Sequence, residues 1–589
     1  MSFLSSLLKR NEHPGGRSEA PIIVENGDSA AVETDGQDMT TKAKGSSPAA
    51  GRSPSPSPSL TPRGSTVATS LASALKRIST GDLLTELHAT NRAPATGTDV
   101  PDQTEKPPVV NVVIVGAGLA GLAAAHSLRS ANQGISILVL EASDRVGGRI
   151  LTRELKSNTG RNFWDLGAQW ISGSQIKMMQ LIDQLDLQIY TQAETGAHLA
   201  HFGDGRKVQF EAQTHPLSSM TRYDYTTFIT KVEKLRLDVS LETPEDCPMA
   251  LEWDSMTLEQ FRKRHIWTAA AQQYFDAQIR ILFGVPPGEM STLFFLYALS
   301  SAGGWHSMFE IGSETAREFR IRGGTQRLCE ILADMVGRSY LRLGDPVISI
   351  NQKDSDEQVT VQTLGGKRYR CERVVVALPP KFAAKINFSP PMAKERDNLL
   401  QRMPAGNSLC FVVTYKEAFW QKLGFSGYVI RVTSPAQKPQ QGEAQTSENC
   451  DHQIPFSALF DATTMDQSPA LSGKVDAEMW REIPVEERKT AILKGIEVFF
   501  GVEALQPLDY TEVDWGAESY SSSFPSSVMA PGAMTGYFQA LRKPFQRVHW
   551  AGAETTNRWF GFMDGAVYSG KRAAHEVLNE LRPDVVIGV

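Results

Sequence analysis

The chain has 589 residues, more than one hydrophobic core usually takes, so we expect two or more domains. Apolar residues make up 41% and charged residues 21%, as in a globular protein in water, and a net charge of −6 gives no reason to expect a nucleic acid or an anionic membrane as partner. Five scattered cysteines without metal-ligand spacing favour a reducing compartment, here the cytoplasm, and argue against a metal site.

Residues 1–107 are predicted to be a disordered, low-complexity tail. They are rich in Ser, Thr, Pro, Gly and Ala, and residues 53–59 alternate Ser and Pro. Within this tail, residues 76–79 (Lys-Arg-Ile-Ser) resemble a kinase site. No apolar run in the chain approaches the roughly 20 residues of a membrane helix, so we expect no transmembrane anchor.

A glycine-rich turn follows the first strongly apolar segment. Residues 109–115 (VVNVVIV) predict a strand buried on both faces, as in a parallel sheet, and residues 122–128 (LAAAHSL) predict a helix. The glycines between them allow a tight turn and a close approach of a pyrophosphate, and the helix N-terminus offers free N–H groups. The candidate pyrophosphate contacts are Gly116, Gly118, Leu119, Ala120 and Gly121.

A second apolar strand, residues 135–140, ends at Glu141, about 20 residues after the turn. An acid at this place is expected to bind ribose hydroxyls and to repel a 2′-phosphate, which disfavours NADP. The order of strand, turn, helix, strand and acid favours nucleotide binding over an ordinary glycine turn. Residues 142–149 add two more glycines and Arg149, whose guanidinium could clamp a phosphate bidentately.

The run from Glu141 to Arg149 (E-A-x-D-R-x-G-G-R) resembles the flavin-containing amine oxidase superfamily. The resemblance implies FAD as the cofactor, with Ala142, Gly148 and Arg149 near it. It also implies that residues 163–170 lie along the flavin and its phosphates, although a strand and turn with a buried Trp would look the same. The further contacts implied are Gly167, Ala168, Gln169 and Trp170, and the backbone of Val347 at the adenine.

The middle of the chain predicts a mixture of helices and strands. Residues 292–301 (TLFFLYALSS) predict an apolar helix, and residues 325–336 predict another. Strands are predicted at residues 346–350, 359–361, 374–378, 411–415 and 428–432, and an exposed insertion at 434–451. Aromatic residues are frequent between 180 and 315, and such stripes are more often core than ligand pocket.

A second signature lies near the C-terminus. Residues 548–554 (VHWAGAE) predict a strand that runs into a glycine turn and an acid, and residues 566–581 predict a helix. This A-G-x-E…G-x-x-x-G-A pattern resembles the C-terminal flavin segment of the same superfamily, where a helix N-terminus can stabilise negative charge on the reduced ring. The resemblance implies cofactor contacts at Gly552, Glu554, Met563 and Ala566.

The fold class implied is α/β, with two domains built from interleaved segments. One is a Rossmann-like FAD-binding domain, and the other is a discontinuous α+β substrate domain, as in the amine oxidase fold. The expected FAD-binding segments are 108–185, 318–385 and 541–589, and the expected substrate-domain segments are 186–317 and 386–540.

The resemblance is closest to monoamine oxidases and covers residues 108–582. It implies that FAD takes hydride equivalents from the α-carbon of a neutral amine and that the imine hydrolyses to an aldehyde or ketone plus ammonia. Oxygen then reoxidises the flavin to give hydrogen peroxide. The implied partners are a small-molecule amine and oxygen, and a homodimer is the open expectation for assembly.

Two departures from the monoamine oxidase pattern concern aromatic residues. Phe524 stands where the animal enzymes attach FAD through a cysteine, so we expect noncovalent FAD. Two tyrosines usually flank the flavin as an aromatic cage, but here the second is Phe562 and the first aligns with Pro525. A cage of Phe562 with Phe524 or Trp515 would still guide an amine by cation–π attraction.

The third departure is Cys410. It aligns, by ungapped counting, with a lysine that in the family holds a water near flavin N5 and assists reaction with oxygen. A thiol is a weak hydrogen-bonding group and cannot replace an ammonium. Three explanations are open: the reactivity with oxygen is reduced, another group takes the role of the lysine, or the count is off by a residue. Cys410 itself is either a catalytic residue or an ordinary buried cysteine. The candidate catalytic residues are Phe562, Trp515 and Cys410.

Two other functions stay open. A polyamine oxidase would need an acidic tunnel, and an L-amino-acid oxidase would need a buried arginine for the carboxylate, for which Arg320, Arg322 and Arg558 are available. A flavoprotein scaffold with little oxidase turnover is the third reading, because the usual lysine is missing and the N-terminal tail is long.

Overall fold

The computed structural model describes residues 108–582, except 132–133, 193–194, 213, 354–357, 433–453 and 476. The chain divides into two units, Met1–Pro101 and Asp102–Val589, and all the described residues belong to the second. The expectations for residues 1–107, including the kinase motif, and for the insertion at 434–451 lie outside the described residues.

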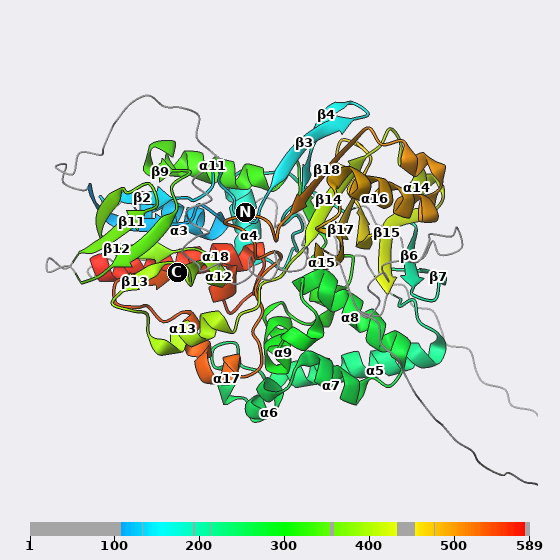
Figure 1. The fold of residues 1–589 in the computed structure, drawn as a ribbon, viewed down its shortest axis with the longest axis horizontal. Coiled ribbons are helices and arrows are strands. Elements are labelled where there is room, and N and C mark those ends of the chain that lie inside the picture. The colour runs from blue at the N-terminus through cyan, green and yellow to red at the C-terminus, as the bar shows by residue number, and fades with distance from the viewer. Residues whose placement is uncertain are drawn as a thin grey trace, which may run out of the picture. The chain divides into compact units, whose positions relative to one another are not determined.

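The first sheet has eight strands, and the glycine turn follows one of its inner strands, β1 (Val109–Val115). Its strands, in spatial order, are β13 (Asn387–Ser389), β10 (Val347–Asn351), β11 (Val359–Thr363), β12 (Arg368–Val376), β1, β2 (Ile137–Leu140) and β9 (Leu341–Arg342), and β19 (Val548–Trp550) also pairs with β12. Strands β2, β11, β12 and β13 of this sheet lie together in Figure 1. Successive residues of β1 face opposite sides of the sheet, with Ile114 in one apolar cluster and Val113 in another. The predicted strand buried on both faces is therefore confirmed.

Strand β12 connects the two predicted flavin signatures. Val374 pairs with Val113 of β1 on one side and with Val548 of β19 on the other, and both pairings are parallel. Because the carboxyl ends of parallel strands lie at one edge of a sheet, the turn after β1 and the turn after β19 emerge together.

Helices α3 (Leu119–Ser130), α11 (Gln326–Val336) and α18 (Met563–Leu581) cover one face of this sheet (Figure 1). Helix α18 packs directly on α3, and the contact requires glycine. A Cβ atom on Gly570 would lie 2.3 Å from the carbonyl oxygen of Ala120. Helix α4 (Ile176–Gln184) also contacts α18. The first and last helices of the described core thus share one interface.

The second sheet has seven strands. In spatial order they are β18 (Asp509–Asp514), β14 (Leu409–Thr414), β17 (Ala470–Val475), β16 (Phe456–Asp461), β15 (Phe425–Val432), β6 (Ala197–Phe202) and β7 (Lys207–Phe210). All neighbours are antiparallel except β15 and β6. Helix α16 (Val485–Phe500) packs on one face of this sheet through Ile492 and Ile496. Two further ribbons are β3 (Thr152–Ser157) with β4 (Gly160–Asp165), and β5 (Ile189–Thr191) with β8 (Phe319–Ile321).

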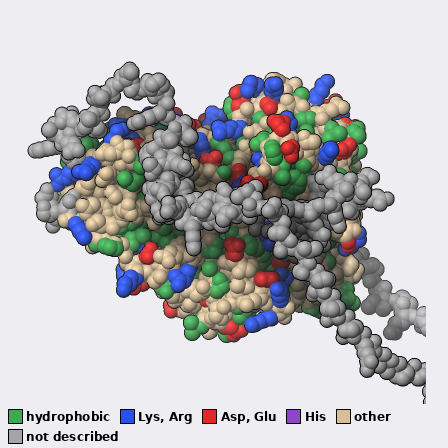
Figure 2. All heavy atoms as spheres, viewed as in Figure 1, with side chains coloured by type: hydrophobic (Ala, Val, Ile, Leu, Met, Phe, Trp, Pro, Cys, Tyr) green, Lys and Arg blue, Asp and Glu red, His purple; other side chains and the backbone are tan. Residues whose placement is uncertain are grey.

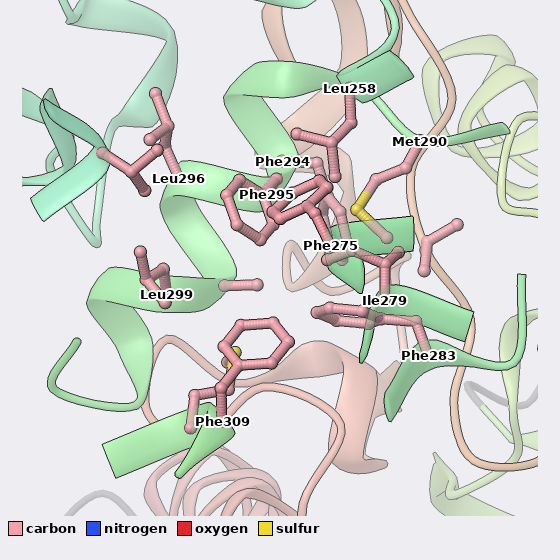
Figure 3. Close-up of a cluster of buried hydrophobic side chains, with 14 of the residues drawn as sticks. Leu258, Phe275, Ile279, Phe283, Met290, Phe294, Phe295, Leu296, Leu299 and Phe309 are labelled. Atoms are coloured by element: carbon pink, nitrogen blue, oxygen red, sulfur yellow. The ribbon is translucent and has the colours of Figure 1, made fainter. Parts of the chain in front are cut away.

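A helical layer provides the largest apolar cluster. Its helices are α5 (Ser219–Leu235), α6 (Ala250–Ser255), α7 (Leu258–His265), α8 (Ala269–Phe283), α9 (Thr292–Ser301) and α10 (Trp305–Phe309). Figure 3 shows phenylalanines of α8, α9 and α10 converging on one another, and the rings of Phe275 and Phe295 are 5.9 Å apart. The helix predicted at 292–301 is confirmed, and its aromatic residues are buried in this core.

The remaining elements are short. The other helices are α12 (Pro380–Ala383), α13 (Lys394–Gln401), α14 (Phe419–Lys422), α15 (Ala477–Trp480) and α17 (Ala533–Tyr537), and single 3₁₀ turns lie at Arg236–Asp238, Pro244–Asp246, Pro287–Glu289, Arg338–Tyr340, Val502–Leu505, Phe538–Leu541 and Ala553–Thr555. Within the described ranges, no helix has the length and apolar character to cross a bilayer. On the face shown in Figure 2, acidic and basic side chains are interspersed. The α/β fold class is confirmed, and the predicted domain boundaries remain a prediction.

Candidate cofactor and substrate site

Glu141 sits at the carboxyl end of β2, where its carboxylate is held by backbone N–H groups. The N–H of Ala117 donates to Oε2 at 2.6 Å, and that of Ser143 donates to Oε1 at 2.9 Å. These bonds tie the acid to the glycine turn after β1. The backbone of Asp345 donates to the Glu141 carbonyl at 3.1 Å, which places the start of β10, with Val347, beside this acid. The predicted ribose and adenine contacts therefore lie close together.

The two glycine turns, at Gly116–Gly118 and Gly147–Gly148, lie against each other. The N–H of Gly147 donates to the Ala117 carbonyl at 2.9 Å, and Gly118 and Gly147 form an isolated parallel bridge. A Cβ atom on Gly121 would lie 1.9 Å from the Gly116 carbonyl oxygen, so Gly121 is required by the protein's own packing. A Cβ atom on Gly118 would meet nothing closer than 3.9 Å. Gly118 thus leaves open space where a bound group can approach.

The donor set around that space fits a dinucleotide. Helix α3 begins at Leu119 with Gly118 as its N-cap, and no side chain caps its first N–H groups. Such an end carries a partial positive charge that suits a pyrophosphate. The helix therefore starts earlier than the predicted residue 122 and includes Leu119 and Ala120. Both residues were predicted to contact the phosphates from the turn before the helix.

The stretch Gly167–Trp170 packs against the backbone of Arg149. A Cβ atom on Gly167 would lie 2.3 Å from the Arg149 carbonyl oxygen, and the N–H of Ala168 donates to that oxygen at 3.2 Å. Gln169 accepts a hydrogen bond from Arg320. The start of the predicted flavin-side stretch therefore lies against the residue that follows the second glycine turn, Gly147–Gly148.

An ion pair joins the two signatures. Arg149 donates from Nη1 to Oε1 of Glu554 at 2.5 Å and from Nη2 to Oε2 at 2.8 Å, and the Glu554 side chain is 1% exposed. Nη1 also donates to the carbonyls of Ser523 and Pro525, each at 3.2 Å. Because both terminal nitrogens are engaged, a bidentate phosphate clamp by Arg149 would require this pair to open, and that role stays a prediction.

The C-terminal segment completes the same region. The N–H of Gly552 donates to the Ser569 hydroxyl at 3.0 Å, and Met563 and Ala566 share an apolar cluster with Leu119 and Ala120. Helix α18 starts at Met563 without a side-chain cap. A second helix N-terminus with free N–H groups is therefore available beside the nucleotide site.

The structure brings two of the three candidate catalytic residues together. Trp515 stacks on Phe524 with ring centroids 4.8 Å apart, and its indole N–H donates to the Leu166 carbonyl at 2.9 Å. Cys410 belongs to the same apolar cluster. Phe562 packs instead on Trp559, at 5.1 Å, and borders the helical core. Trp515 and Phe524, the two alternative partners of Phe562 in the predicted cage, thus contact each other, and the cage itself stays a prediction.

Cys410 faces a lysine that the sequence analysis missed. In the register of β14 and β17, Cys410 pairs with Lys474, so both side chains project from the same face. The Lys474 ammonium donates to the Ile281 carbonyl at 2.7 Å and lies 5.7 Å from the centre of the Phe524 ring. The only local signal was one charged residue within an otherwise apolar strand.

Burial sets the charge states of this pair. It raises the pKa of the Cys410 thiol to about 11, so the group is a neutral thiol near pH 7. It lowers the pKa of Lys474 to about 8. Lys474 keeps some accessible surface, but the protein around it is dense enough to disfavour the charged form. The ammonium, not the thiol, is the polar group of the pair.

A small hollow, partly open to solvent, lies beside Trp170. Its lining residues are Trp170, Gln192, His198, Ile311, Arg317, Ser426, Tyr428, Phe460 and Asp461. Of the arginines named from the sequence, Arg320 binds Gln169, Arg322 pairs with Asp466 at the surface, and Arg558 is exposed. Arg317, which no motif marked, is the arginine in this hollow.

Comparison with known proteins agrees with this geometry. The model of the flavin containing amine oxidoreductase family matches residues 119–578. Amine oxidase [flavin-containing] A of Bos taurus is 32% identical over 477 residues, covering 80% of this chain and 85% of the relative. A probable flavin-containing monoamine oxidase A of Dictyostelium discoideum is 32% identical over 476 residues, covering 80% and 98%.

Two solved structures share the fold and some sequence. Cyclohexylamine oxidase from Brevibacterium oxydans IH-35A superposes with a TM-score of 0.71 at 26% identity, covering 80% of this chain and all of that one. A putrescine oxidase bound to putrescine gives a TM-score of 0.71 at 25% identity, with the same coverage. The chain therefore belongs to the flavin-containing amine oxidoreductase family, and it is an FAD-dependent amine oxidase.

Proposed function

We propose that this enzyme oxidises the α-carbon of its amine substrate with noncovalently held FAD, using residues from both ends of the described chain. The observation that carries the proposal is the Arg149–Glu554 ion pair, which joins the two flavin signatures at one place. Bound FAD supplies the acceptor for the two electrons of the amine and passes them to oxygen, so that the products are an imine, which water hydrolyses, and hydrogen peroxide.

The chain's own residues bind and orient the cofactor. Glu141 would bind the ribose, and the uncapped start of α3 would bind the pyrophosphate. The backbone beside Val347 would contact the adenine. The uncapped start of α18 offers a positive end to the flavin ring. The full proposed set is Gly116, Gly118, Leu119, Ala120, Gly121, Glu141, Ala142, Gly148, Arg149, Gly167, Ala168, Gln169, Trp170, Val347, Gly552, Glu554, Met563 and Ala566.

The test is a titration of the purified full-length protein. The protein should have a flavin absorbance spectrum that bleaches with an amine under anaerobic conditions and recovers in air. A spectrum that no amine, polyamine or amino acid bleaches would contradict the proposal. Reduced flavin that persists for many minutes in air would instead favour the reading as a flavoprotein with little oxidase turnover.

Noncovalent attachment is supported by the residue at position 524. Phe524 has no nucleophilic atom, and its ring is stacked on Trp515. The cysteine in the same cluster, Cys410, is a poor nucleophile because burial keeps its pKa near 11. Acid precipitation should leave the yellow flavin in the supernatant. Flavin that stays with the precipitated chain would show a covalent bond.

We also propose that Lys474 provides the ammonium expected at position 410. Its charge lies on the strand next to Cys410 and near Phe524, in the cluster that borders the cofactor segments. In Lys474→Met, the reduced enzyme should react with oxygen about tenfold more slowly or worse, because a fixed positive charge near developing negative charge is lost. The exposed Lys494→Met is the matched control, and equal rates in both variants would rule out the role.

Cellular location and assembly are further proposals. The four described cysteines, Cys247, Cys329, Cys371 and Cys410, are all buried and free, which supports a reducing compartment such as the cytoplasm. Fractionation of cells with an antibody to the chain will test this location. Light scattering on the purified protein will decide between a monomer and the expected homodimer.

A further inference from the structure

We infer that the hollow beside Trp170 binds a carboxylate of the substrate, and that Arg317 is the cation that recognises it. The substrate class is then an amino acid with an apolar or aromatic side chain, rather than a simple monoamine. This inference rests on the amine oxidation proposed above and names the substrate of that same site.

Arg317 is a buried cation without a counter-charge. The residue is only 8% exposed, and its Nη1 atom is buried with no hydrogen-bond partner. Among the described residues, no carboxylate oxygen lies within ion-pair distance of its guanidinium. A buried, unpaired charge is strongly unfavourable, so its presence at a hollow indicates a missing anionic partner.

The acid that lines the hollow is already satisfied. Oδ2 of Asp461 accepts from the indole N–H of Trp420 at 2.7 Å and from Gln421 at 2.8 Å. Its Oδ1 accepts from the backbone of Thr463 at 2.6 Å. Buried Arg262 pairs with Asp276 at 2.9 Å. Buried Arg396 has no carboxylate partner either, but it donates to the carbonyls of Ala540 and Leu541. No described carboxylate neutralises Arg317, so its Nη1 atom is available to an anion that enters the hollow.

Aromatic rings hold the guanidinium without neutralising it. Its central carbon lies 5.8 Å from the ring centre of Trp170 and 5.4 Å from that of Phe460. Those two rings meet edge to face at 4.9 Å, and Tyr428 packs on Phe460 at 5.4 Å. These rings lie close to the guanidinium of Arg317 and give a ligand in the hollow an apolar wall.

His198 is a second unpartnered group in the same hollow. Its Nε2 atom is buried without a hydrogen-bond partner, while Nδ1 binds the Ser426 hydroxyl. Burial, with a smaller contribution from Arg317, lowers the pKa of His198 to about 4, so the ring is neutral near pH 7. One cation, one neutral imidazole and aromatic walls suit a carboxylate better than a phosphate dianion.

Trp170 connects the hollow to the proposed cofactor stretch, because it lines the hollow and follows directly on the residues that pack against Arg149. The charge on Arg317 also contributes to the lowered pKa of Lys474. A second ammonium group on the substrate would be repelled by the charge of Arg317, whereas a carboxylate group on the substrate would be attracted to it.

Binding is tested first without turnover. The FAD-loaded full chain is titrated with benzoate and with its neutral analogue benzamide, and the flavin absorbance and the tryptophan fluorescence are recorded. Benzoate should bind about tenfold more tightly than benzamide or better, as expected for a charge-assisted pair. Equal affinities, or no binding of benzoate, would overturn the inference.

Variants assign the effect to Arg317. In Arg317→Gln the preference for benzoate should disappear, whereas Arg317→Lys should keep part of it because the charge remains and the fork is lost. Arg322→Gln is the matched control, since this nearby arginine is exposed and pairs with Asp466. FAD content and melting temperature show that each variant is folded. An Arg317→Gln protein that is folded and still prefers benzoate would refute the assignment.

Turnover then separates the two proposals. With phenylalanine and phenethylamine as a pair, Arg317→Gln should lower kcat/KM for the amino acid by about ten- to hundredfold and leave that for the amine equal or higher. If the wild type oxidises only the amine and binds no benzoate, this inference fails and amine oxidation stands. If neither compound bleaches the flavin but benzoate binding depends on Arg317, the anion site stands and the proposed reaction fails.

Discussion

The Arg149–Glu554 pair links the two segments that carry the predicted flavin signatures. Glu554→Gln removes the charge and leaves Arg149, whose side chain is 16% exposed, with two carbonyls as its remaining partners. We expect the free energy of unfolding to fall by about 2–4 kcal/mol, near the lower end for a broken buried pair because Arg149 reaches some solvent.

Urea denaturation followed by circular dichroism measures that loss. Asp204→Asn is the control, because its partner Arg206 forms an exposed pair whose removal should not move the midpoint. The double variant Arg149→Gln with Glu554→Gln should recover part of the stability, since no lone charge remains. A single variant as stable as the wild type would show that the pair contributes little.

Lys474 makes stability depend on pH. Its pKa is about 8 in the folded protein and near 10.5 when unfolded, so the unfolded chain binds more protons between these values. Stability linked to this group therefore rises as pH increases from about 8 to 10.5. Relative to Lys474→Met, the wild type should gain roughly 1–3 kcal/mol over that range.

Thermal or urea unfolding at several pH values checks this difference. Groups far from Lys474 titrate equally in both proteins and cancel in the comparison, and Cys410→Ala in both backgrounds removes the one coupled thiol. A difference between wild type and Lys474→Met that is constant from pH 7 to 10 would mean that the ammonium keeps its ordinary pKa.

At the scale of elements, the contact of α18 with α3 depends on Gly570. In Gly570→Ala the new Cβ atom would lie 2.3 Å from the Ala120 carbonyl, so the helices must separate. We expect a loss of about 1–3 kcal/mol of stability and weaker retention of FAD, because the start of α3 belongs to the pyrophosphate site. Melting temperature and FAD content after gel filtration measure both effects.

The matched control is Gly536→Ala. Gly536 lies in the short helix α17, and a Cβ atom there would meet nothing within 4 Å. This change should be neutral or slightly stabilising, since alanine favours a helix over glycine. Equal behaviour of the two alanine variants would show that α18 and α3 can move apart without consequence.

Sequence patterns predicted helices and strands well where their bounds are marked by residues close in the sequence. The strand at 109–115 and the helix at 292–301 have the predicted bounds, because apolar runs and Gly or Ser punctuation mark their ends. Boundaries set by tertiary pairing were predicted less well. Strand β12 starts at Arg368 rather than near 374, since its first half pairs with β11.

The site residues show the same division. The glycine turns and Glu141 follow from the spacing that a nucleotide requires, and Glu554 follows from the resemblance to the family, so all of them were candidates before the structure was known. Lys474 and Arg317 were not, because their proposed roles arise from a strand register and from rings contributed by distant segments. Lys474 was visible in the sequence as the one charged residue of its strand, but its pairing with Cys410 on the neighbouring strand was not.

At the scale of the whole molecule, FAD should act as a stabilising ligand of the fold. The cofactor would contact segments from β1 to α18, so removing it withdraws contacts from both ends of the described chain. At a free FAD concentration of 100 times its Kd, the holoenzyme should be about 2.7 kcal/mol more stable than the apoprotein.

Dialysis against a mild chaotrope followed by melting curves with graded FAD measures this linkage. The melting temperature should rise with the logarithm of FAD concentration. FMN, which lacks the adenosine that Glu141 and the Val347 region would bind, should shift it less. Equal shifts of the melting temperature with FAD and FMN would show that the protein does not bind the adenosine part of FAD.

Strand β12 lies between β1 and β19, so the flavin edge of this sheet is finished only by a strand close to the end of the chain. A polypeptide made only as far as β12 therefore carries one of the two proposed halves of the site. We expect stable uptake of FAD to begin only after β19 and α18 have docked on β12 and α3.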